Sequence, residues 1–345
     1  MEKTQLQHRI DTLDYLRGFA LLGIIFMNII GLISPDLPAV NTMDAAYQRF
    51  LYLFVEGRFY SIFSFLFGIG FYIFMTRALA KGNNGYILFL RRIVALFAIG
   101  FIHQMFQPGE ALALYAICGL LLIPFYKLSK HINLLIALAG ISLFGYLGDK
   151  LLLTFPLILL GLAVGQYRIF ERLASLQKQV WGFTIIMMLL SAAGLWYQVQ
   201  YLPSEPFIPY VIAGDLDPFL IQVNQFLTIG IMIGPLVSAA FVGMLILLLQ
   251  MKAVQTLLAP LKYYGRMALT NYLSQTALIL LATQWFQQSG TITYMETFYI
   301  CLAIHFILIM LSMAWLRFFK MGPMEWLWRA VTYMQLPPLL KKNDK

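Results

Sequence analysis

Two sets of polar side chains interrupt the apolar stretches of this sequence at spacings that could support chemistry. Histidine changes charge near neutral pH, so His103 is a candidate general base, and a nearby carboxylate would fix its tautomer. Given a helical rise of about 1.5 Å per residue, several polar residues of neighbouring stretches fall at a similar depth. This predicted outer layer, a candidate catalytic site, comprises Asn28, Glu56, Arg58, His103 and Glu110.

A second, basic set lies nearer the other side of the same stretches. Asp14 and Arg17 are three residues apart, so they share one helix face and can pair. Arginine side chains can instead extend to the interface and remain solvated there, and the Asp14–Arg17 pair can simply anchor its helix. His103, likewise, fits a structural role as well as a catalytic one. This predicted inner layer comprises Asp14, Arg17, Arg91, Arg92, Arg266 and Asn271.

Composition places these residues in a membrane protein. The chain has 345 residues, of which 61% are hydrophobic and only 11% charged. A soluble domain carries roughly a quarter charged residues, so the sequence favours lipid as its surroundings. No cleavable signal pattern precedes the first apolar stretch. Cys118 and Cys301 both lie in apolar stretches, which predicts neither a disulfide framework nor a metal site.

The apolar stretches predict an all-α, polytopic bundle of about ten membrane-spanning helices in a single domain, 1–345. Seven spans fall in 13–202 and three in 220–319, followed by an interfacial helix and polar tail over 322–345. Pro323 is expected to start that last helix. Only a short break at 148–150 separates the fifth predicted span from the sixth. The predicted spans are 13–33, 50–75, 87–106, 110–126, 132–148, 151–167, 180–202, 220–249, 266–286 and 297–319.

The distribution of basic residues predicts the orientation. Of the 24 Lys and Arg residues, twenty fall in the two terminal segments or the loops after even-numbered spans, whereas the opposite loops hold Arg49 and Lys150. Cytoplasmic loops carry such an excess, so both termini are expected in the cytoplasm of a bacterial cell, with the protein in its cytoplasmic (inner) membrane. The net charge of +9 is then explained by topology and lipid phosphate, and predicts no nucleic-acid partner.

Several blocks, in order along the chain, resemble the signature blocks of the YeiB-like integral membrane family, domain of unknown function 418. They are RIDTLDYLRGFALLGIIFMNI (9–29), GRFYSIFSFLFGIGF (57–71), RRIVALFAIGFIH (91–103), YYGRMALTNYLSQT (263–276) and GPMEWLWR (322–329). Where that family often has Gly-Asp-Ile-Leu after the histidine, this chain has GEAL (109–112), so Glu110 is a longer carboxylate. The first block also resembles that of transmembrane acyltransferases, which take acyl-CoA from the cytosol and acylate a sugar across the membrane.

Three functions follow as expectations. The resemblance implies an acyltransferase with acyl-CoA as co-substrate and a small-molecule or glycan acceptor. The positions of the two layers then suggest the inner-layer arginines for the donor phosphates and His103 for the acceptor side, and no metal is predicted. A proton-coupled transporter or exporter is the alternative, with Glu56, His103 and Glu110 as a proton relay. No internal repeat or paired broken helix is evident to support it. A non-catalytic membrane scaffold is the third. The sequence does not fix the oligomeric state.

Overall fold

A computed structural model describes residues 10–209, 217–286 and 291–341 of the chain. Within these ranges the chain is built from helices, and its one β pairing is an isolated bridge between Phe319 and Leu340. The helices, in chain order, are α2 (Asp11–Ile33), α3 (Met43–Phe50), η1 (Leu51–Val55), α4 (Arg58–Ala80), α5 (Gly85–His103), α6 (Leu112–Leu122), η2 (Pro124–Lys127), α7 (Lys130–Tyr146), α8 (Lys150–Gln166), η3 (Phe170–Ser175), α9 (Gln177–Val199), α10 (Pro218–Leu248), α11 (Lys252–Leu257), α12 (Ala259–Arg266), α13 (Ala268–Phe286), α14 (Tyr294–Phe318) and α15 (Pro323–Tyr333).

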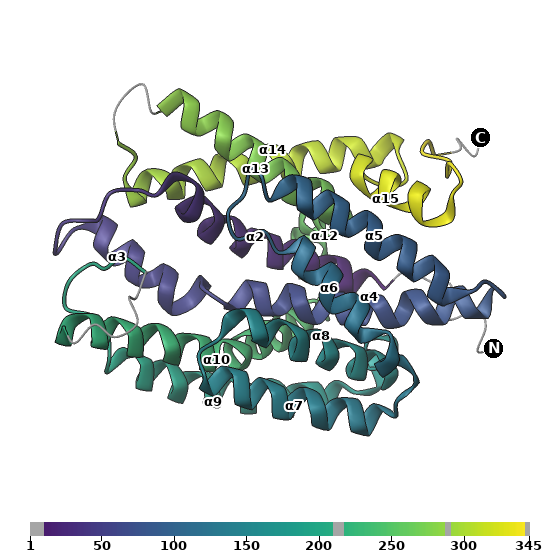
Figure 1. Cartoon of the computed structure of the whole chain (residues 1–345), viewed down its shortest axis with the longest axis horizontal. Coiled ribbons are helices and arrows are strands. Elements are labelled where there is room, and N and C mark those ends of the chain that lie inside the picture. Colours follow the sequence, from purple (N-terminus) through teal and green to yellow (C-terminus); the bar gives the residue numbers. More distant parts are fainter. Residues whose placement is uncertain (1–9, 210–216, 287–290, 342–345) are drawn as a thin grey trace.

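Most of these helices run along the long axis of the molecule, and the first and last described residues lie at the same end (Figure 1). We call this the terminal end, and the end reached by α3 and the start of α14 the opposite end. Six helical segments are long and apolar enough to cross a membrane, and α6, α7 and α8 are shorter apolar helices. The chain is therefore a helical membrane protein. The count of ten spans and the cytoplasmic placement of the termini stay predictions.

Local signals define the helix ends that matter for the site. Gly148, with φ of 68°, follows α7 in the left-handed region that favours glycine. The next residue, Asp149, accepts a hydrogen bond from the backbone N–H of Leu152 at 2.9 Å and so caps α8. The predicted break between the fifth and sixth spans is thus present, and it places Lys150 at the first position of α8.

The centre of the bundle depends on close contact between α4 and α8. A Cβ atom on Gly68 would clash with the carbonyl oxygen of Ile158, and one on Gly161 would clash with the carbonyl oxygen of Phe65. Small residues allow helix backbones in membranes to approach in this way. Gly18 and Gly265 have the same role where α2 meets α12, because a Cβ on either would strike the other helix's backbone.

The segment from Met43 to Ala80 is one apolar run that is interrupted in the structure. It begins as α3, continues as the π-helical turn η1, and breaks at Glu56 and Gly57 before α4 starts at Arg58. Gly57 has a φ of 76°. The sequence predicted one uninterrupted span here, 50–75. Glycines occur within several of the predicted helices, so the Glu56–Gly57 pair gave no distinct signal for a helix break. π-Helical turns are frequent at functional sites.

The turn between α5 and α6 does not reach the opposite end. It lies well inside the length of the molecule, short of α3 and α9 (Figure 1). The physical reason is length, because α6 spans only 11 residues, or about 16 Å at 1.5 Å per residue. The predicted span 87–106 puts His103, the last residue of α5, near its outer end, whereas in the structure the turn that follows His103 lies deeper in the molecule (Figure 1).

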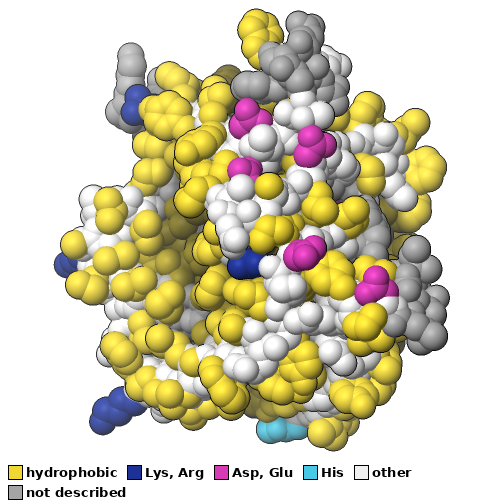
Figure 2. Space-filling view, turned by 90° about the vertical axis from the view of Figure 1, so that its left-hand side faces the viewer, with side chains coloured by type: hydrophobic (Ala, Val, Ile, Leu, Met, Phe, Trp, Pro, Cys, Tyr) yellow, Lys and Arg dark blue, Asp and Glu magenta, His cyan; other side chains and the backbone are white. Residues whose placement is uncertain are grey.

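The two ends of the molecule differ in charge. Asp36, Glu205, Asp217 and Glu296 are exposed near the opposite end. Figure 2 faces that end and shows acidic side chains gathered on it, beside a hollow bordered mainly by hydrophobic side chains. This asymmetry agrees with the basic bias of the loops at the terminal end.

The C-terminal region folds back onto the bundle. Helix α15 starts at Pro323, as predicted, and packs against α5 and α13. The carboxylate of Glu325 accepts hydrogen bonds from the backbone N–H groups of Leu269 and Thr270 at 2.7 and 3.2 Å. It also accepts one from the Thr270 hydroxyl at 2.6 Å. Glu325 therefore caps α13 from a distant part of the chain.

Candidate functional site

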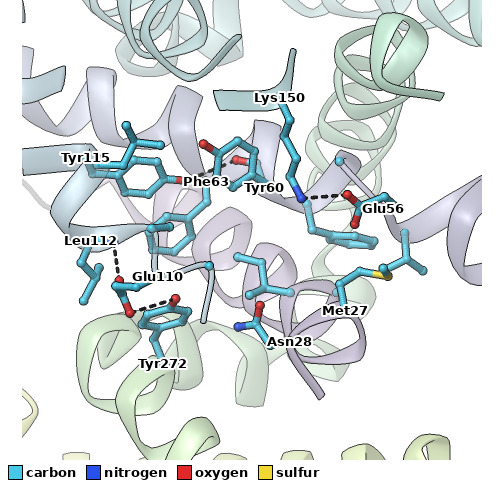
Figure 3. A pocket seen from close by; sticks show the side chains of 18 of the residues that line it. Met27, Asn28, Glu56, Tyr60, Phe63, Glu110, Leu112, Tyr115, Lys150 and Tyr272 are labelled. Atoms are coloured by element: carbon cyan, nitrogen blue, oxygen red, sulfur yellow. Dashed lines mark hydrogen bonds and ion pairs between the residues drawn. The ribbon is translucent and has the colours of Figure 1, made fainter. Parts of the chain in front are cut away.

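A cavity of about 250 Å³ lies between α2, the Glu56–Gly57 break, the start of α4, the α5–α6 turn, α8 and α13. Phe59, Phe63 and Met27 supply much of its apolar wall. Figure 3 shows its polar side chains converging from these separate elements. The polar lining consists of Asn28, Glu56, Tyr60, Glu110, Tyr115, Lys150 and Tyr272.

Glu110 faces the cavity and is held on both oxygens. One oxygen contacts the Nδ1 atom of His103 and accepts a hydrogen bond from the Tyr272 hydroxyl at 3.5 Å. The other accepts one from the backbone N–H of Leu112. The side chains of His103 and Glu110 are 7% and 0% exposed. The His103 ring is not part of the cavity lining. It packs edge-to-face against the Tyr272 ring, with the ring centroids 5.3 Å apart.

The carboxylate determines which nitrogen of His103 carries the proton. Nδ1 faces Glu110, so an ionised Glu110 holds the proton on Nδ1 and leaves a lone pair on Nε2 of the neutral ring. Within the described chain the buried Nε2 atom has no hydrogen-bond partner. The pair therefore has one unused proton-accepting position on the imidazole, while the carboxylate of Glu110, and not the ring of His103, lines the cavity.

A second pair faces Glu110 across the cavity. The Lys150 ammonium donates to the Glu56 carboxylate at 2.8 Å. It also lies 5.3 Å from the centroid of the Tyr60 ring. Lys150 is 38% exposed and Glu56 20%, so this pair stands where the cavity is more open than at Glu110. The cavity thus combines two carboxylates and an ammonium with aromatic rings.

The outer layer predicted from sequence converges in part. Asn28, Glu56 and Glu110 line the cavity, and His103 contacts Glu110. The Tyr272 hydroxyl lies within hydrogen-bonding reach of the Asn28 side chain. These placements bring the predicted residues together without testing their chemical roles.

Arg58 is the exception among the predicted outer-layer residues. It is 1% exposed and is not part of the cavity wall. Its guanidinium donates to the carbonyl oxygens of Glu56 at 2.5 Å and Gly230 at 3.1 Å, and to the side-chain oxygen of Gln198 at 3.1 Å. These partners lie at the break and on α9 and α10, so Arg58 ties the interrupted segment to its neighbours.

The members of the predicted inner layer have separate surroundings. Asp14 is buried and pairs with Arg17 at 2.9 Å. Arg92 stacks on Trp328, while Arg91 is exposed and Arg266 partly buried.

Asn271 has a structural role in that layer. Its side-chain amide donates to the Tyr264 carbonyl oxygen at 2.8 Å and to the Ser312 hydroxyl at 2.9 Å. These bonds join α12, α13 and α14, so the amide group is occupied within the protein.

Sequence reasoning missed Tyr60, Tyr115, Lys150 and Tyr272 as cavity residues. Three of these are tyrosines in a sequence with 19 of them, so composition gave no reason to select them. Lys150 did carry a signal, because it is one of two basic residues in loops that are otherwise without them. Among the described residues, no group of three or more His, Cys, Asp and Glu side chains is arranged to hold a metal ion.

Comparison with known proteins places these features in a family. The family described as "Protein of unknown function (DUF418)" matches residues 205–335. An uncharacterised 39.9 kDa protein of the amylase 3′ region in Bacillus acidopullulyticus is 52% identical over 347 residues, covering 100% of this chain and 99% of that protein.

Two further relatives also align along almost their whole length. YxaH of Bacillus subtilis is 28% identical over 409 residues, covering 99% of both chains. YeiB of Escherichia coli is 26% identical over 401 residues, covering 97% of this chain and 99% of YeiB. No solved structure matches the chain. The protein therefore belongs to the DUF418, YeiB-like family.

Proposed function

We propose that this protein is a membrane acyltransferase that moves an acyl group from cytosolic acyl-CoA to a small hydroxyl- or amine-bearing acceptor, such as a sugar unit, bound in the cavity. The observation that carries the proposal is the buried His103–Glu110 pair, with Glu110 on the cavity wall and Nε2 of His103 still able to accept a proton. The resemblance of the first-helix block, 9–29, to transmembrane acyltransferases gives the reaction class.

The proposed reaction uses the pair as a proton acceptor. The acceptor hydroxyl or amine lies against Glu110, its proton passes to the Glu110–His103 pair, and its oxygen or nitrogen attacks the thioester carbonyl of the donor. The carbon–sulfur bond breaks, and the CoA thiolate leaves and takes up the proton. Asn28 supplies a donor to the negative charge that develops on the carbonyl oxygen.

The second cavity pair has a binding role in this proposal. Lys150 can donate to, and Glu56 can accept from, the hydroxyl groups of an acceptor, and the rings of Phe59 and Phe63 offer an apolar wall. Wall aromatics with few convergent polar groups are typical of small-molecule sites.

The donor is proposed to enter from the terminal end. Of the basic side chains there, the proposal assigns Arg17, Arg91, Arg92 and Arg266 to the phosphates of CoA. Asn271 is not included, because its amide is used between helices.

The test is transfer by purified protein in proteoliposomes. Radiolabelled short-chain acyl-CoA is supplied with a panel of sugars and amines, and labelled acceptor is measured. We expect labelled product with at least one acceptor, and about 10²–10⁴-fold slower formation of it with Glu110→Gln. Glu205→Gln is the matched control, because Glu205 is exposed in the loop after α9. Folded protein that neither binds nor hydrolyses any acyl-CoA would overturn the proposal.

The broken helix supports one alternative function, proton-coupled transport. The Glu56–Gly57 break lines the cavity, and discontinuous helices often form the substrate and ion sites of transporters. The same vesicles separate the two functions. Accumulation of unmodified substrate driven by a pH gradient would favour transport, whereas covalently acylated product without a gradient would favour transfer.

A further inference from the structure

Three arginines from distant parts of the chain meet at the terminal end. Arg17 comes from α2, Arg92 from α5 and Arg329 from α15. Arg329 directly follows Trp328, whose ring stacks on the Arg92 guanidinium, and the charges of Arg17 and Arg329 both act on Arg92. We refer to Arg17, Arg92 and Arg329 as the arginine cluster.

The position of Arg92 is fixed by α15. Its guanidinium carbon lies 3.5 Å from the centroid of the Trp328 ring and 5.2 Å from that of Phe74. The Trp328 indole N–H donates to the Arg92 carbonyl oxygen at 2.8 Å. Aromatic faces attract a guanidinium and leave its edge N–H groups available for another partner. Helix α15 thus both positions Arg92 and adds Arg329 beside it.

The arginine cluster carries more positive charges than the carboxylates paired with it can neutralise. Asp14 pairs with Arg17. The Glu325 carboxylate is used by the first turn of α13. Among the described residues, no carboxylate lies within ion-pair distance of Arg92 or Arg329. Like charges held together destabilise a fold unless an anion compensates them.

From this geometry we infer that the arginine cluster binds a phosphate-bearing ligand, and that α15 completes this site by contributing Arg329. Phosphate oxygens accept charge-assisted hydrogen bonds from arginine, with bidentate geometry. Two sources share this chemistry, a lipid headgroup at the membrane surface and the phosphates of soluble coenzyme A. Arg329 is exposed, so the site is open to either.

The experiment measures binding of each source separately. Delipidated protein in detergent is titrated with coenzyme A by calorimetry, and retention of phosphatidylglycerol is counted by native mass spectrometry. Arg329→Gln is the test variant, since an exposed residue is replaced without disturbing the fold. Arg317→Gln is the matched control, because Arg317 is exposed in the last turn of α14 at the same end.

We expect Arg329→Gln to weaken binding of at least one probe about tenfold, as for loss of one charge-assisted contact, and Arg317→Gln to leave it unchanged. Loss of coenzyme A binding identifies the donor, and loss of phosphatidylglycerol identifies a lipid. The inference is overturned if wild-type protein binds neither probe, or if both variants weaken binding equally. Because binding needs no turnover, failure of acyl transfer leaves this result interpretable.

Discussion

At the scale of single residues, the structure separates side chains that face the cavity from those that support its walls. Glu110, Asn28 and Lys150 face the cavity, whereas Arg58 is turned away toward α9 and α10. Depth along a helix could be calculated from the sequence, and it placed Glu110, Asn28 and Arg58 at comparable levels. The direction in which each side chain points depends on the packing of the helices, which spacing alone does not reveal.

This separation predicts different effects on stability. Arg58→Met leaves the carbonyl oxygen of Gly230 and the side-chain oxygen of Gln198 without their buried donor, so we expect a loss of about 3 kcal/mol or more. Lys150→Met removes a pair that is partly exposed, and we expect a loss of no more than about 1 kcal/mol. Thermal unfolding of both variants in detergent is the measurement. Equal midpoints would contradict the supporting role of Arg58.

At the scale of elements, the apolar windows predicted helices that the structure contains within a few residues at most ends. The predicted window 132–148, for example, corresponds to α7 at Lys130–Tyr146. The break at Glu56–Gly57 and the short helices α11 and α12 were not predicted. The ninth window was expected to start at residue 266, but α13 starts at Ala268 after α12 has ended. These features follow from tertiary contacts, such as α12 on α2, that leave no periodic signal.

The contact between α4 and α8 gives a matched pair of variants on one helix. A Cβ atom at Gly68 would strike the Ile158 carbonyl oxygen, while a Cβ at Gly70 would have nothing within 4 Å. We expect Gly68→Ala to cost roughly 1–3 kcal/mol or more through overpacking, and Gly70→Ala to be neutral or slightly stabilising. Expression level and unfolding midpoint measure this. A well-folded Gly68→Ala protein of normal stability would argue against the close helix contact.

The α15–α13 contact predicts a pH dependence. Burial raises the pKa of the Glu325 carboxyl above its ordinary value of 4.5, although its hydrogen bonds to Thr270 and Leu269 act in the other direction. The folded protein then holds this proton where the unfolded chain has lost it, so the stabilisation is present below pH 4.5 and lost as pH rises through the folded pKa.

The measurement is the unfolding midpoint of wild type and Glu325→Gln from pH 4.5 upward. We expect the difference, wild type minus variant, to fall as the pH increases, because the glutamine does not titrate. A difference that stays constant across this range would show that Glu325 does not titrate with a raised pKa.

At the scale of the whole molecule, the charge asymmetry predicts the orientation. Arg172 lies at the terminal end and Glu205 at the opposite end, and both are exposed. We expect a membrane-impermeant thiol reagent to label Glu205→Cys in intact cells, and to label Arg172→Cys only after the membrane is opened. The two natural cysteines are buried and give little background. Labelling of Arg172→Cys in intact cells would contradict cytoplasmic termini.

The central claim is that His103 and Glu110 act as one proton-accepting unit. The most direct test compares acyl-transfer rates of His103→Ala, Glu110→Gln and the double variant in protein of confirmed thermal stability. We predict that each single change lowers the rate by about 10²–10⁴-fold and that the double variant is no slower than either, because removing one partner already disables the pair. A folded single variant that retains the wild-type rate would contradict the claim.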